Sequence, residues 1–236
     1  MNNPSQQLAM KNFIFDLYNT LIDIETDEHT ESAWSPVVEF FGARGMKTDW
    51  RTLCDGYDRY WKLYMERAVA EREFSFPECD ETAIFQSIAR SVRGNLSEAD
   101  AVLASLAMHT AAVKHMYLFD GTVELLKELR SRGCGVYLLS NAQSVIARSS
   151  MKQCGLDESL FDGIMISSDE RVRKPDPAFF ELLFDKYNLD KKSAVMIGDD
   201  RTTDIRGANA FGIASVWAGG GAAAHSEEIL ASAAQE

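Results

Sequence analysis

The stretch FIFDLYNTLID, residues 13–23, places an apolar run directly before an acidic residue, Asp16. Short apolar runs of this kind are typical of strands that are buried on both faces. A carboxylate at the end of such a strand is costly to bury unless a partner offsets its charge. We therefore predict a strand from Asn12 to Asp16 that ends in a functional site, with Tyr18 and Thr20 in the loop that follows.

The composition is that of an ordinary globular protein with an acidic balance. The chain has 236 residues, of which 46% are hydrophobic and 25% charged, and its formal net charge is −12 at pH 7. Because no basic stripe offsets repulsion from a phosphate backbone, we expect no nucleic-acid partner. No apolar run approaches the roughly 20 residues that a membrane span needs, so we expect no membrane partner either.

The cysteines and histidines are dispersed, which argues against a disulfide framework or a zinc site. No CxxC pair occurs, and the amino-terminal residues lack the basic and apolar regions of a signal peptide. We therefore expect a cytoplasmic protein with reduced cysteines, whose metal chemistry must use oxygen ligands. The cysteines are Cys54, Cys79, Cys134 and Cys154, and the histidines are His29, His109, His115 and His225.

Residues 25–117 form a long predicted helical region with no strand. Four segments carry apolar residues at helical spacing, and Ser97 is placed to cap the last of them. Aromatic residues of the second segment, such as Tyr57 and Trp61, are best interpreted as packing residues of a helix bundle. From Leu118 onward, short apolar strands alternate with helical segments, which predicts a parallel sheet covered on both faces.

The first strand has no partner nearby in the sequence, so we expect it to join this later sheet. The predicted architecture is therefore α/β: a doubly wound parallel sheet with an inserted, all-helical domain of four helices. We place the sheet domain in residues 1–23 and 118–236, and the helical domain in residues 24–117. Hinges are expected near residues 23–27 and 117–121.

Polar side chains gather at the ends of the predicted strands. In an open parallel sheet, ligands bind at the carboxyl ends of the strands, so these side chains should lie on one rim. Each has an ordinary explanation when taken alone, such as helix capping or turn formation, but together they predict a catalytic site. The set comprises Asp16, Ser140, Asn141, Lys174, Asp199, Asp200 and Asp204.

The charges of this set favour a divalent cation. Asp16 and the later aspartates would repel each other at one sheet edge. Mg²⁺ removes this repulsion, and proteins typically hold it with one or two carboxylates together with substrate phosphate oxygens. Lys174 and the hydroxyls of Thr20 and Ser140 then supply donors to an anionic group, so that Asp16 is suited to attack a phosphoryl group.

The order of these motifs resembles the haloacid dehalogenase-like (HAD) superfamily, most of whose members are Mg²⁺-dependent phosphohydrolases. The motifs are FDLYNT, LLSN, RKPDP and IGDDRTTD, and the match spans the whole chain. The resemblance implies a Rossmann-like core in which the helical insertion is the four-helix type of the family's cap domain. It also implies that Asp16 is the nucleophile, that Thr20 and Ser140 bind the transferred phosphoryl group, and that Lys174 stabilises its charge.

The same resemblance implies a set of metal ligands. Asp199 is expected to bind Mg²⁺ together with Asp16, and either Asp200 or Asp204 is expected to assist. The backbone carbonyl of Tyr18 would be a further ligand.

Tyr18 departs from the pattern of the family's phosphatases, which usually carry a second Asp at this position as general acid and base. A phenol with an ordinary pKa near 10 is poorly suited to that role at neutral pH. The 2-haloacid dehalogenases of the same superfamily carry a tyrosine here, since halide leaves without a proton. They need no metal, however, and their pattern has Ser and Asn where this chain has GDD. Their tyrosine after the lysine is also absent, because KPDPAFF offers Phe179 and Phe180.

Three hypotheses follow. The first is a Mg²⁺-dependent phosphatase of small phosphorylated metabolites, the second a metal-independent 2-haloacid dehalogenase, and the third a phosphate-binding or regulatory protein with weak turnover. We give more weight to the predicted metal site than to Tyr18, and we therefore favour the Mg²⁺-dependent phosphatase. The substrate is not readable from the sequence, and a homodimer through exposed aromatic surface of the helical domain is compatible with it. Arginines that could meet an anionic substrate, although solvated surface charge explains each of them better, are Arg44, Arg59, Arg67 and Arg72.

Overall fold

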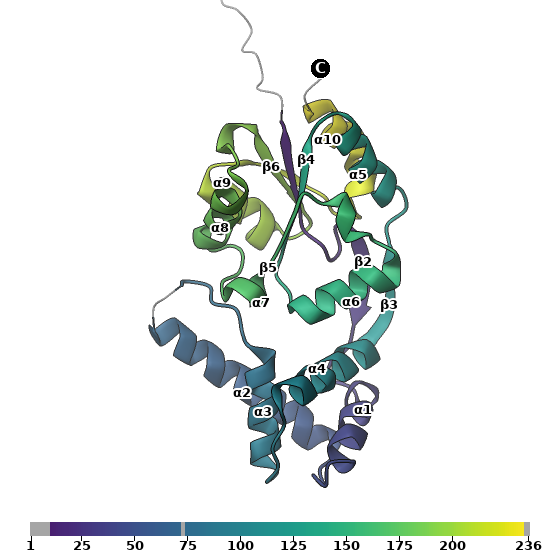
Figure 1. The fold of residues 1–236 in the computed structure, drawn as a ribbon, viewed down its shortest axis with the longest axis vertical. Helices are drawn as coiled ribbons and strands as arrows, with labels where there is room; N and C mark the ends of the chain where they lie inside the picture. Colours follow the sequence, from purple (N-terminus) through teal and green to yellow (C-terminus); the bar gives the residue numbers. More distant parts are fainter. Residues whose placement is uncertain (1–9, 72–73, 234–236) are drawn as a thin grey trace, which may run out of the picture.

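The computed structural model describes residues 10–71 and 74–233, which form two bodies stacked end to end (Figure 1). The larger body is a sheet with helices on both faces, and the smaller is a group of helices below the carboxyl ends of the strands. Arg72 lies outside the described residues. No helix in the described ranges combines the length and the apolar composition that a bilayer crossing requires.

A five-stranded parallel sheet forms the centre of the larger body. Its strands are β1 (Asn12–Phe15), β4 (Gly135–Ser140), β5 (Gly163–Ile166), β6 (Ala194–Gly198) and β7 (Ala214–Trp217). The strand order is β5-β4-β1-β6-β7. Phe13 of β1 is in register with Val136 of β4 and with Val195 of β6. The first strand therefore lies in the middle of a sheet built by the far end of the chain, which confirms the predicted fold class.

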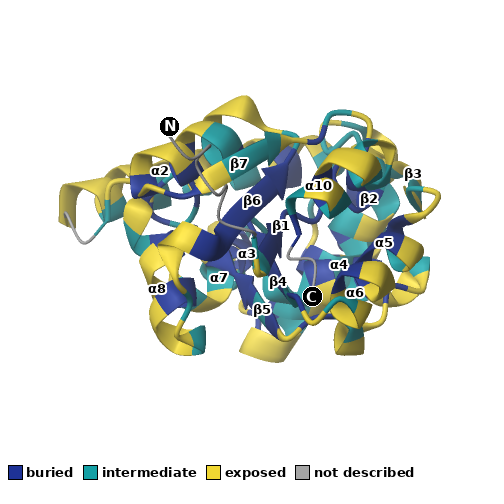
Figure 2. Ribbon diagram, turned by 90° about the horizontal axis from the view of Figure 1, so that it is seen from above, coloured by how far each residue is buried: buried dark blue, intermediate teal, exposed yellow. Residues whose placement is uncertain are grey.

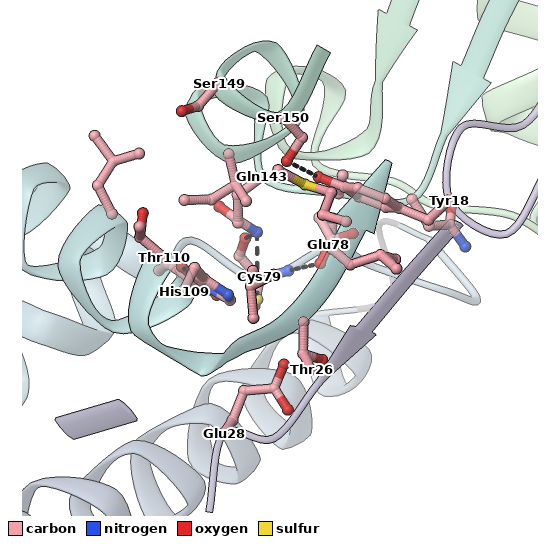
Figure 3. A pocket seen from close by; sticks show the side chains of 18 of the residues that line it. Tyr18, Thr26, Glu28, Glu78, Cys79, His109, Thr110, Gln143, Ser149 and Ser150 are labelled. Atoms are coloured by element: carbon pink, nitrogen blue, oxygen red, sulfur yellow. Dashed lines mark hydrogen bonds and ion pairs between the residues drawn. The ribbon is translucent and has the colours of Figure 1, made fainter. Parts of the chain in front are cut away.

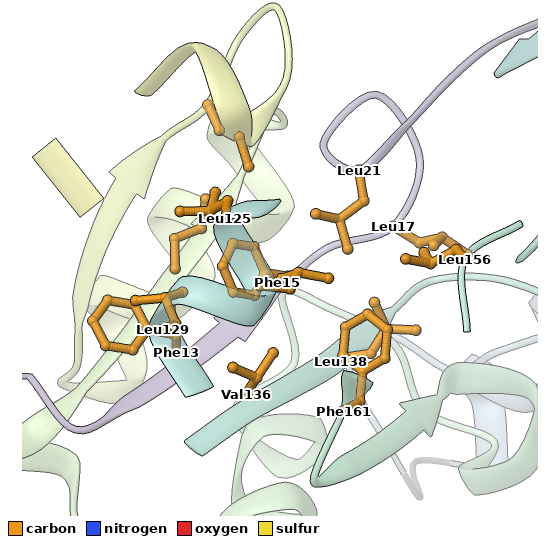
Figure 4. Packing of buried hydrophobic residues seen from close by; sticks show 14 of the residues in the cluster. Phe13, Phe15, Leu17, Leu21, Leu125, Leu129, Val136, Leu138, Leu156 and Phe161 are labelled. Carbon is orange, nitrogen blue, oxygen red and sulfur yellow. The ribbon is translucent and has the colours of Figure 1, made fainter. Parts of the chain in front are cut away.

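Both faces of the sheet are buried under helices (Figure 2). Phe13 and Phe15 pack on one face, against α5 (Thr122–Ser131), α6 (Ser144–Cys154) and α10 (Ser226–Ser232), as Figure 4 shows in part. Ile14 points to the other face, against α8 (Pro177–Tyr187) and α9 (Arg206–Phe211). This two-sided burial explains why β1 reads as an unbroken apolar run rather than as an alternating one.

Short helical turns complete the larger body. They are η1 (Glu158–Leu160), α7 (Ser167–Glu170), η2 (Lys191–Ser193), the π-helical turn η3 (Arg201–Ile205) and η4 (Ala222–His225).

The inserted segment folds as a domain of four helices, as the sequence predicted. They are α1 (Glu31–Gly42), α2 (Trp50–Glu71), α3 (Glu81–Ser91) and α4 (Glu98–Ala112). Ser97 caps α4 by accepting a hydrogen bond from the backbone N–H of Asp100. Trp34, Tyr57 and Phe85 pack together with ring centroids 5.7–6.0 Å apart, so these aromatic residues do form the core of the helical domain.

The prediction that residues 25–117 contain no strand is wrong. A two-stranded antiparallel ribbon, β2 (Ile22–Thr26) and β3 (Val113–Leu118), joins the helical domain to the sheet domain. Its strands cross both predicted domain boundaries. This ribbon was not predictable from local patterns, because β3 follows α4 without a break and its partner strand lies at the opposite end of the inserted segment.

A second connection, which we call the strap, consists of residues 74–79 and leaves the helical domain between α2 and α3. The strap runs antiparallel to residues 171–173, with Pro77 paired to Val172. Arg173 donates its backbone N–H to Phe76 at 3.0 Å, and Glu78 donates its own to Arg171 at 2.9 Å. The strap therefore bonds the helical domain to the loop that carries Lys174.

A buried polar cluster lies in the helical domain beside its aromatic core. The Glu81 carboxylate accepts hydrogen bonds from Tyr57 Oη at 2.6 Å, Ser105 Oγ at 2.6 Å and His109 Nε2 at 2.9 Å. Burial alone would lower the pKa of His109 and raise that of Glu81, but their mutual contact dominates. As a result, the pKa of His109 is raised and that of Glu81 is lowered.

We expect His109→Gln to destabilise the protein in a pH-dependent way. The contribution of His109 to the free energy of unfolding is complete below its ordinary pKa of 6.5 and is lost as pH rises through its raised folded pKa. The contribution of Glu81 is complete above its ordinary pKa of 4.5. At pH 5.5 we expect a loss of about 2 kcal/mol, or roughly 4–8 °C in Tm, since breaking a buried ion pair is costly. Thermal unfolding should show this difference shrinking from pH 6.5 to pH 9. His115→Gln, which breaks an exposed pair with Asp23, is the matched control and should change Tm little. A pH-independent loss at His109 would contradict the ion pair.

Candidate active site

Asp16 stands where the sequence placed it, immediately after β1 at the carboxyl edge of the sheet. Its backbone N–H donates to the Ile197 carbonyl at 2.9 Å, which fixes the residue against β6. The loop that follows turns back at once, because Leu21 donates its N–H to the Leu17 carbonyl at 2.8 Å and Asn19 takes a left-handed φ of 56°. Asp16 is buried, with 8% of the residue exposed.

Lys174 is the centre of the charged cluster. Its Nζ donates to Asp16 Oδ1 and to Asp204 Oδ1, both at 2.6 Å, and the side chain is buried. Burial alone would lower the pKa of Lys174, but the two carboxylates raise it, so the ammonium stays charged.

Asn141 holds this lysine in place. Its Oδ1 accepts the Lys174 backbone N–H at 2.8 Å, and its Nδ2 donates to the Lys174 carbonyl at 2.9 Å. Both ends of the amide are therefore occupied by the backbone of Lys174. In this structure Asn141, which the sequence placed among the catalytic candidates, positions the lysine loop.

Asp199 and Asp204 meet Asp16 at the rim. One carboxylate oxygen from each of the three residues lies within 4.8 Å of the others. Thr20 Oγ1 donates to Asp199 Oδ1 at 3.3 Å and accepts the Asp199 backbone N–H at 3.1 Å, which ties the two loops together. Gly198 leaves the room that Asp204 needs, since a Cβ at Gly198 would lie 2.2 Å from Asp204 Oδ2.

Asp200 is not part of this group. It is exposed, and its Oδ1 accepts the backbone N–H groups of Thr202 at 2.6 Å and Thr203 at 3.0 Å, as a helix N-cap does. Of the two residues that the sequence left as alternatives, the structure thus brings Asp204 to the rim.

The cluster carries more negative than positive charge. Burial raises the pKa of Asp16 to about 7, with Lys174 opposing the shift and Asp204 adding to it. Burial and Asp204 also raise the pKa of Asp199. Within the described residues, three carboxylates share one ammonium. An all-oxygen donor set with this excess charge fits Mg²⁺, a hard cation that prefers oxygen ligands.

Ser140 supplies a second indication of a ligand. Ser140 is the last residue of β4, the strand beside β1, and it is 1% exposed. Ser140 Oγ has no hydrogen-bond partner among the described residues. Buried hydroxyls are normally paired, so this donor is available to an oxygen of a bound substrate.

Tyr18 faces away from the carboxylates. Its hydroxyl lies 3.0 Å from Ser150 Oγ on α6, and burial raises its pKa above that of an ordinary tyrosine. A phenol that holds its proton more tightly is a still poorer general acid. The structure thus gives Tyr18 a place in the wall of a cavity, and its backbone carbonyl as a metal ligand stays a prediction.

This cavity, about 510 Å³ in volume, lies between the helical domain and the sheet domain (Figure 3). Tyr18 and Ser150 line it from the sheet domain, and Glu78 and His109 line it from the strap and α4. Arg173 also lines it, which sequence reasoning missed. The signal available was its position next to Lys174 in RKPDP.

The arginines proposed from the sequence lie elsewhere. Arg44 pairs with Asp100 at 2.6 Å, Arg67 pairs with Glu71 at 2.8 Å, and the Arg59 guanidinium lies 5.4 Å from the centroid of the Tyr60 ring. None of these three lines the cavity.

Comparison with known proteins gives three findings. A family model of haloacid dehalogenase-like hydrolases matches residues 10–212. The chain is 25% identical over 208 residues to glyceraldehyde 3-phosphate phosphatase from Pyrococcus furiosus, covering 88% of this chain and 80% of that one. It is 23% identical over 215 residues to (S)-2-haloacid dehalogenase 4A from Burkholderia cepacia, with coverages of 88% and 82%.

Among solved structures, the fold resembles the putative HAD hydrolase YfnB from Bacillus subtilis bound to magnesium. The TM-score is 0.52 at 17% identity, and the match covers 89% of this chain and 88% of that one.

We expect Lys174→Met to destabilise the protein more at pH 8 than at pH 5. The folded pKa of Asp16, about 7, already exceeds its ordinary value of 3.8, so its ionisation costs stability as pH rises between these values, and losing the lysine increases that cost. Breaking a buried ion pair predicts a loss of roughly 6–15 °C in Tm at pH 8 in EDTA. Added Mg²⁺ should restore part of the lost Tm. The control is Lys192→Met, which removes an exposed lysine. A loss of Tm that did not depend on pH or on Mg²⁺ would contradict the inference that Lys174 offsets the charge of the carboxylates.

Proposed function

Because the chain belongs to the haloacid dehalogenase-like hydrolases, we propose that it is a Mg²⁺-dependent phosphatase of small phosphorylated metabolites. The observation that carries this proposal is the group of three carboxylates, Asp16, Asp199 and Asp204, of which only Asp16 and Asp204 are paired with the buried Lys174. A site with this much negative charge would repel a second anion unless a cation were added. The similarity to a phosphatase from Pyrococcus furiosus supports the same activity.

The contacts divide the proposed roles. Asp16 and Asp199 would hold Mg²⁺, with the Tyr18 carbonyl as a backbone ligand. Both oxygens of Asp204 already accept hydrogen bonds, from Lys174 Nζ and from the Asp200 backbone N–H at 3.0 Å, so its main role would be to fix the lysine. When bound, Mg²⁺ supplies positive charge that offsets the charge developing on the phosphoryl oxygens.

In the first step, an Asp16 carboxylate oxygen attacks the phosphorus atom and the bond to the leaving oxygen breaks, which leaves an aspartyl phosphate. Lys174 Nζ lies 2.6 Å from the attacking carboxylate and can donate to the phosphoryl oxygens at the same time. The unpartnered Ser140 hydroxyl offers a further donor. In the second step, water hydrolyses the aspartyl phosphate and regenerates Asp16.

The proton for the leaving group is the unusual part of this mechanism. Tyr18 is hydrogen-bonded to Ser150, and its raised pKa makes it a weak proton donor to the leaving group. We therefore propose that the enzyme prefers phosphates whose leaving groups need no proton, such as acyl or aryl phosphates, or takes a proton from the helical domain.

Tyr18 also favours the second candidate function, a metal-independent 2-haloacid dehalogenase, and a Burkholderia cepacia dehalogenase is among the relatives. Two features weigh against it. Phe179 and Phe180, where the dehalogenase pattern has a tyrosine, are fully buried in the core beneath the sheet. A carboxylate substrate would also meet the three aspartates without a metal to offset them, at a cost of about 4 kcal/mol for each close pair at an effective dielectric of 20.

Two assays decide between these candidates. We expect p-nitrophenyl phosphate hydrolysis that requires Mg²⁺, is abolished by EDTA and falls by at least about 1,000-fold in Asp16→Asn, which lacks the nucleophile. Chloride release from 2-chloropropionate should be absent. Chloride release in EDTA would establish the dehalogenase instead. Stabilisation by phosphate and Mg²⁺ without turnover on any phosphate ester would indicate a regulatory protein.

Replacing Tyr18 with Asp should restore a general acid. We expect Tyr18→Asp to raise kcat for alkyl phosphates by roughly 10- to 100-fold with Mg²⁺ present, because a positioned acid typically contributes that much or more. Tyr18→Phe, which loses only the hydroxyl and its contact with Ser150, is the control and should leave alkyl phosphates as poor substrates. If the Asp variant gains nothing on alkyl phosphates, the missing acid is not what limits their turnover.

A further inference from the structure

Arg173 presents an unpaired cation to the cavity between the two domains. Its Nε is buried and has no hydrogen-bond partner, and its guanidinium forms no ion pair with any described carboxylate. Burying an N–H donor without an acceptor is unfavourable, and most such donors in native proteins are paired. The unpaired, buried Nε of an arginine on a cavity wall therefore points to a ligand that completes it.

The backbone of Arg173 is fixed on both sides. Its N–H donates to Phe76 of the strap at 3.0 Å, and its carbonyl accepts the Asp176 N–H at 3.0 Å. The next residue, Lys174, is held by Asn141. This side chain is therefore anchored at its base, unlike an arginine on a free surface loop.

Of the other charged groups that line the cavity, Glu28 carries a negative charge, and Glu78, Glu81 and His109 are already paired. Glu78 accepts hydrogen bonds from the Cys79 N–H at 2.8 Å and from Ser167 Oγ at 2.6 Å. His109 is paired with Glu81. Among the described lining residues, Arg173 is thus the cation left for an anionic ligand.

Arg173 and Lys174 direct their charges to different places. Lys174 Nζ contacts the carboxylates at the rim, whereas Arg173 lines the cavity with Tyr18 and Asn141. Asp16 itself does not line this cavity, but Tyr18 from the loop after Asp16 and Asn141 next to Ser140 do, so the cavity adjoins the rim. A substrate whose phosphoryl group sits at Asp16 could therefore extend its remaining atoms into the cavity, whose volume suits a small organic molecule.

We propose that Arg173 binds a second oxyanion of the substrate, so that the enzyme selects small phosphate esters or anhydrides that also carry a carboxylate or a second phosphate. This inference rests on the proposed phosphatase function and specifies its substrate class. The planar guanidinium pairs well with either oxyanion, because both accept two parallel N–H donors.

The test measures binding apart from turnover, by titration calorimetry in the Asp16→Asn background with Mg²⁺. 3-Phosphoglycerate and glycerol 3-phosphate differ by a carboxylate, and fructose 1,6-bisphosphate and fructose 6-phosphate differ by a phosphate. We expect at least one doubly anionic probe to bind roughly tenfold or more tightly than its partner, as charge-assisted pairing would give. The pair with the larger ratio identifies the second anion.

Adding Arg173→Gln should reduce the ratio of affinities between the doubly anionic probe and its partner to about one. Arg173→Lys should retain part of this ratio, since lysine keeps the charge but loses the planar pairing. Arg171→Gln removes the same charge from an exposed position on the same loop and should leave the ratio unchanged. Tm of Arg173→Gln should stay near that of its parent, because Nε is unpaired and the guanidinium forms no ion pair within the described residues.

A ratio that survives Arg173→Gln, or the absence of any preference in the parent, would overturn the inference. Failure of the proposed function is seen separately, as the absence of p-nitrophenyl phosphate turnover in the wild-type protein. In otherwise wild-type protein, Arg173→Gln should raise KM for the preferred doubly anionic substrate with little change in kcat.

Discussion

The contacts of Lys174 with Asp16 and Asp204 are the interaction on which the rest of the site depends. They join the loops after β1, β5 and β6, which come from distant parts of the sequence. The ammonium is nearly inaccessible to solvent, so its charge is stable only because the two carboxylates face it. The parallel sheet makes this possible, since it brings the carboxyl ends of all its strands to one edge.

Around this centre, each neighbour satisfies a specific requirement. Asn141 uses both ends of its amide on the backbone of Lys174, and Gly198 leaves the volume that the Asp204 carboxylate fills. Thr20 bonds the backbone and the side chain of Asp199. These residues are the reason that three acids stay close together, because a carboxylate that was free to rotate would move away from its neighbours.

Much of this arrangement was predictable from the sequence, because strand ends can be located from local patterns. A run such as FIF before Asp16 marks a buried strand, and parallel topology then places the later aspartates and Lys174 on the same edge. The separate roles of Asp200 and Asp204 within GDDRTTD were not predictable, because they depend on which of the two carboxylates the π-helical turn directs inward. Asn141 was correctly placed on the edge of the sheet, but its amide bonds the backbone of Lys174, a contact that the sequence did not predict.

Other features depend on contacts between distant segments and leave little local trace. The pairing of β2 with β3 joins the two ends of the inserted segment, and β3 reads as a continuation of the preceding helix. Arg173 looks like one more charged residue in a turn until the strap and the cavity wall are seen beside it. Burial without a partner is a property of the folded molecule, and composition or spacing does not reveal it.

The ribbon of β2 and β3 has a mechanical consequence. Because the outgoing and returning chains are hydrogen-bonded to each other, they connect the two domains as one ribbon instead of two independent tethers. Rotation of the helical domain about this ribbon is opposed by the second connection, in which Phe76 and Glu78 of the strap form backbone hydrogen bonds with residues 171–173. These backbone bonds therefore lie on the same loop that carries Lys174. Breaking them to open the site would also loosen the loop that holds this lysine.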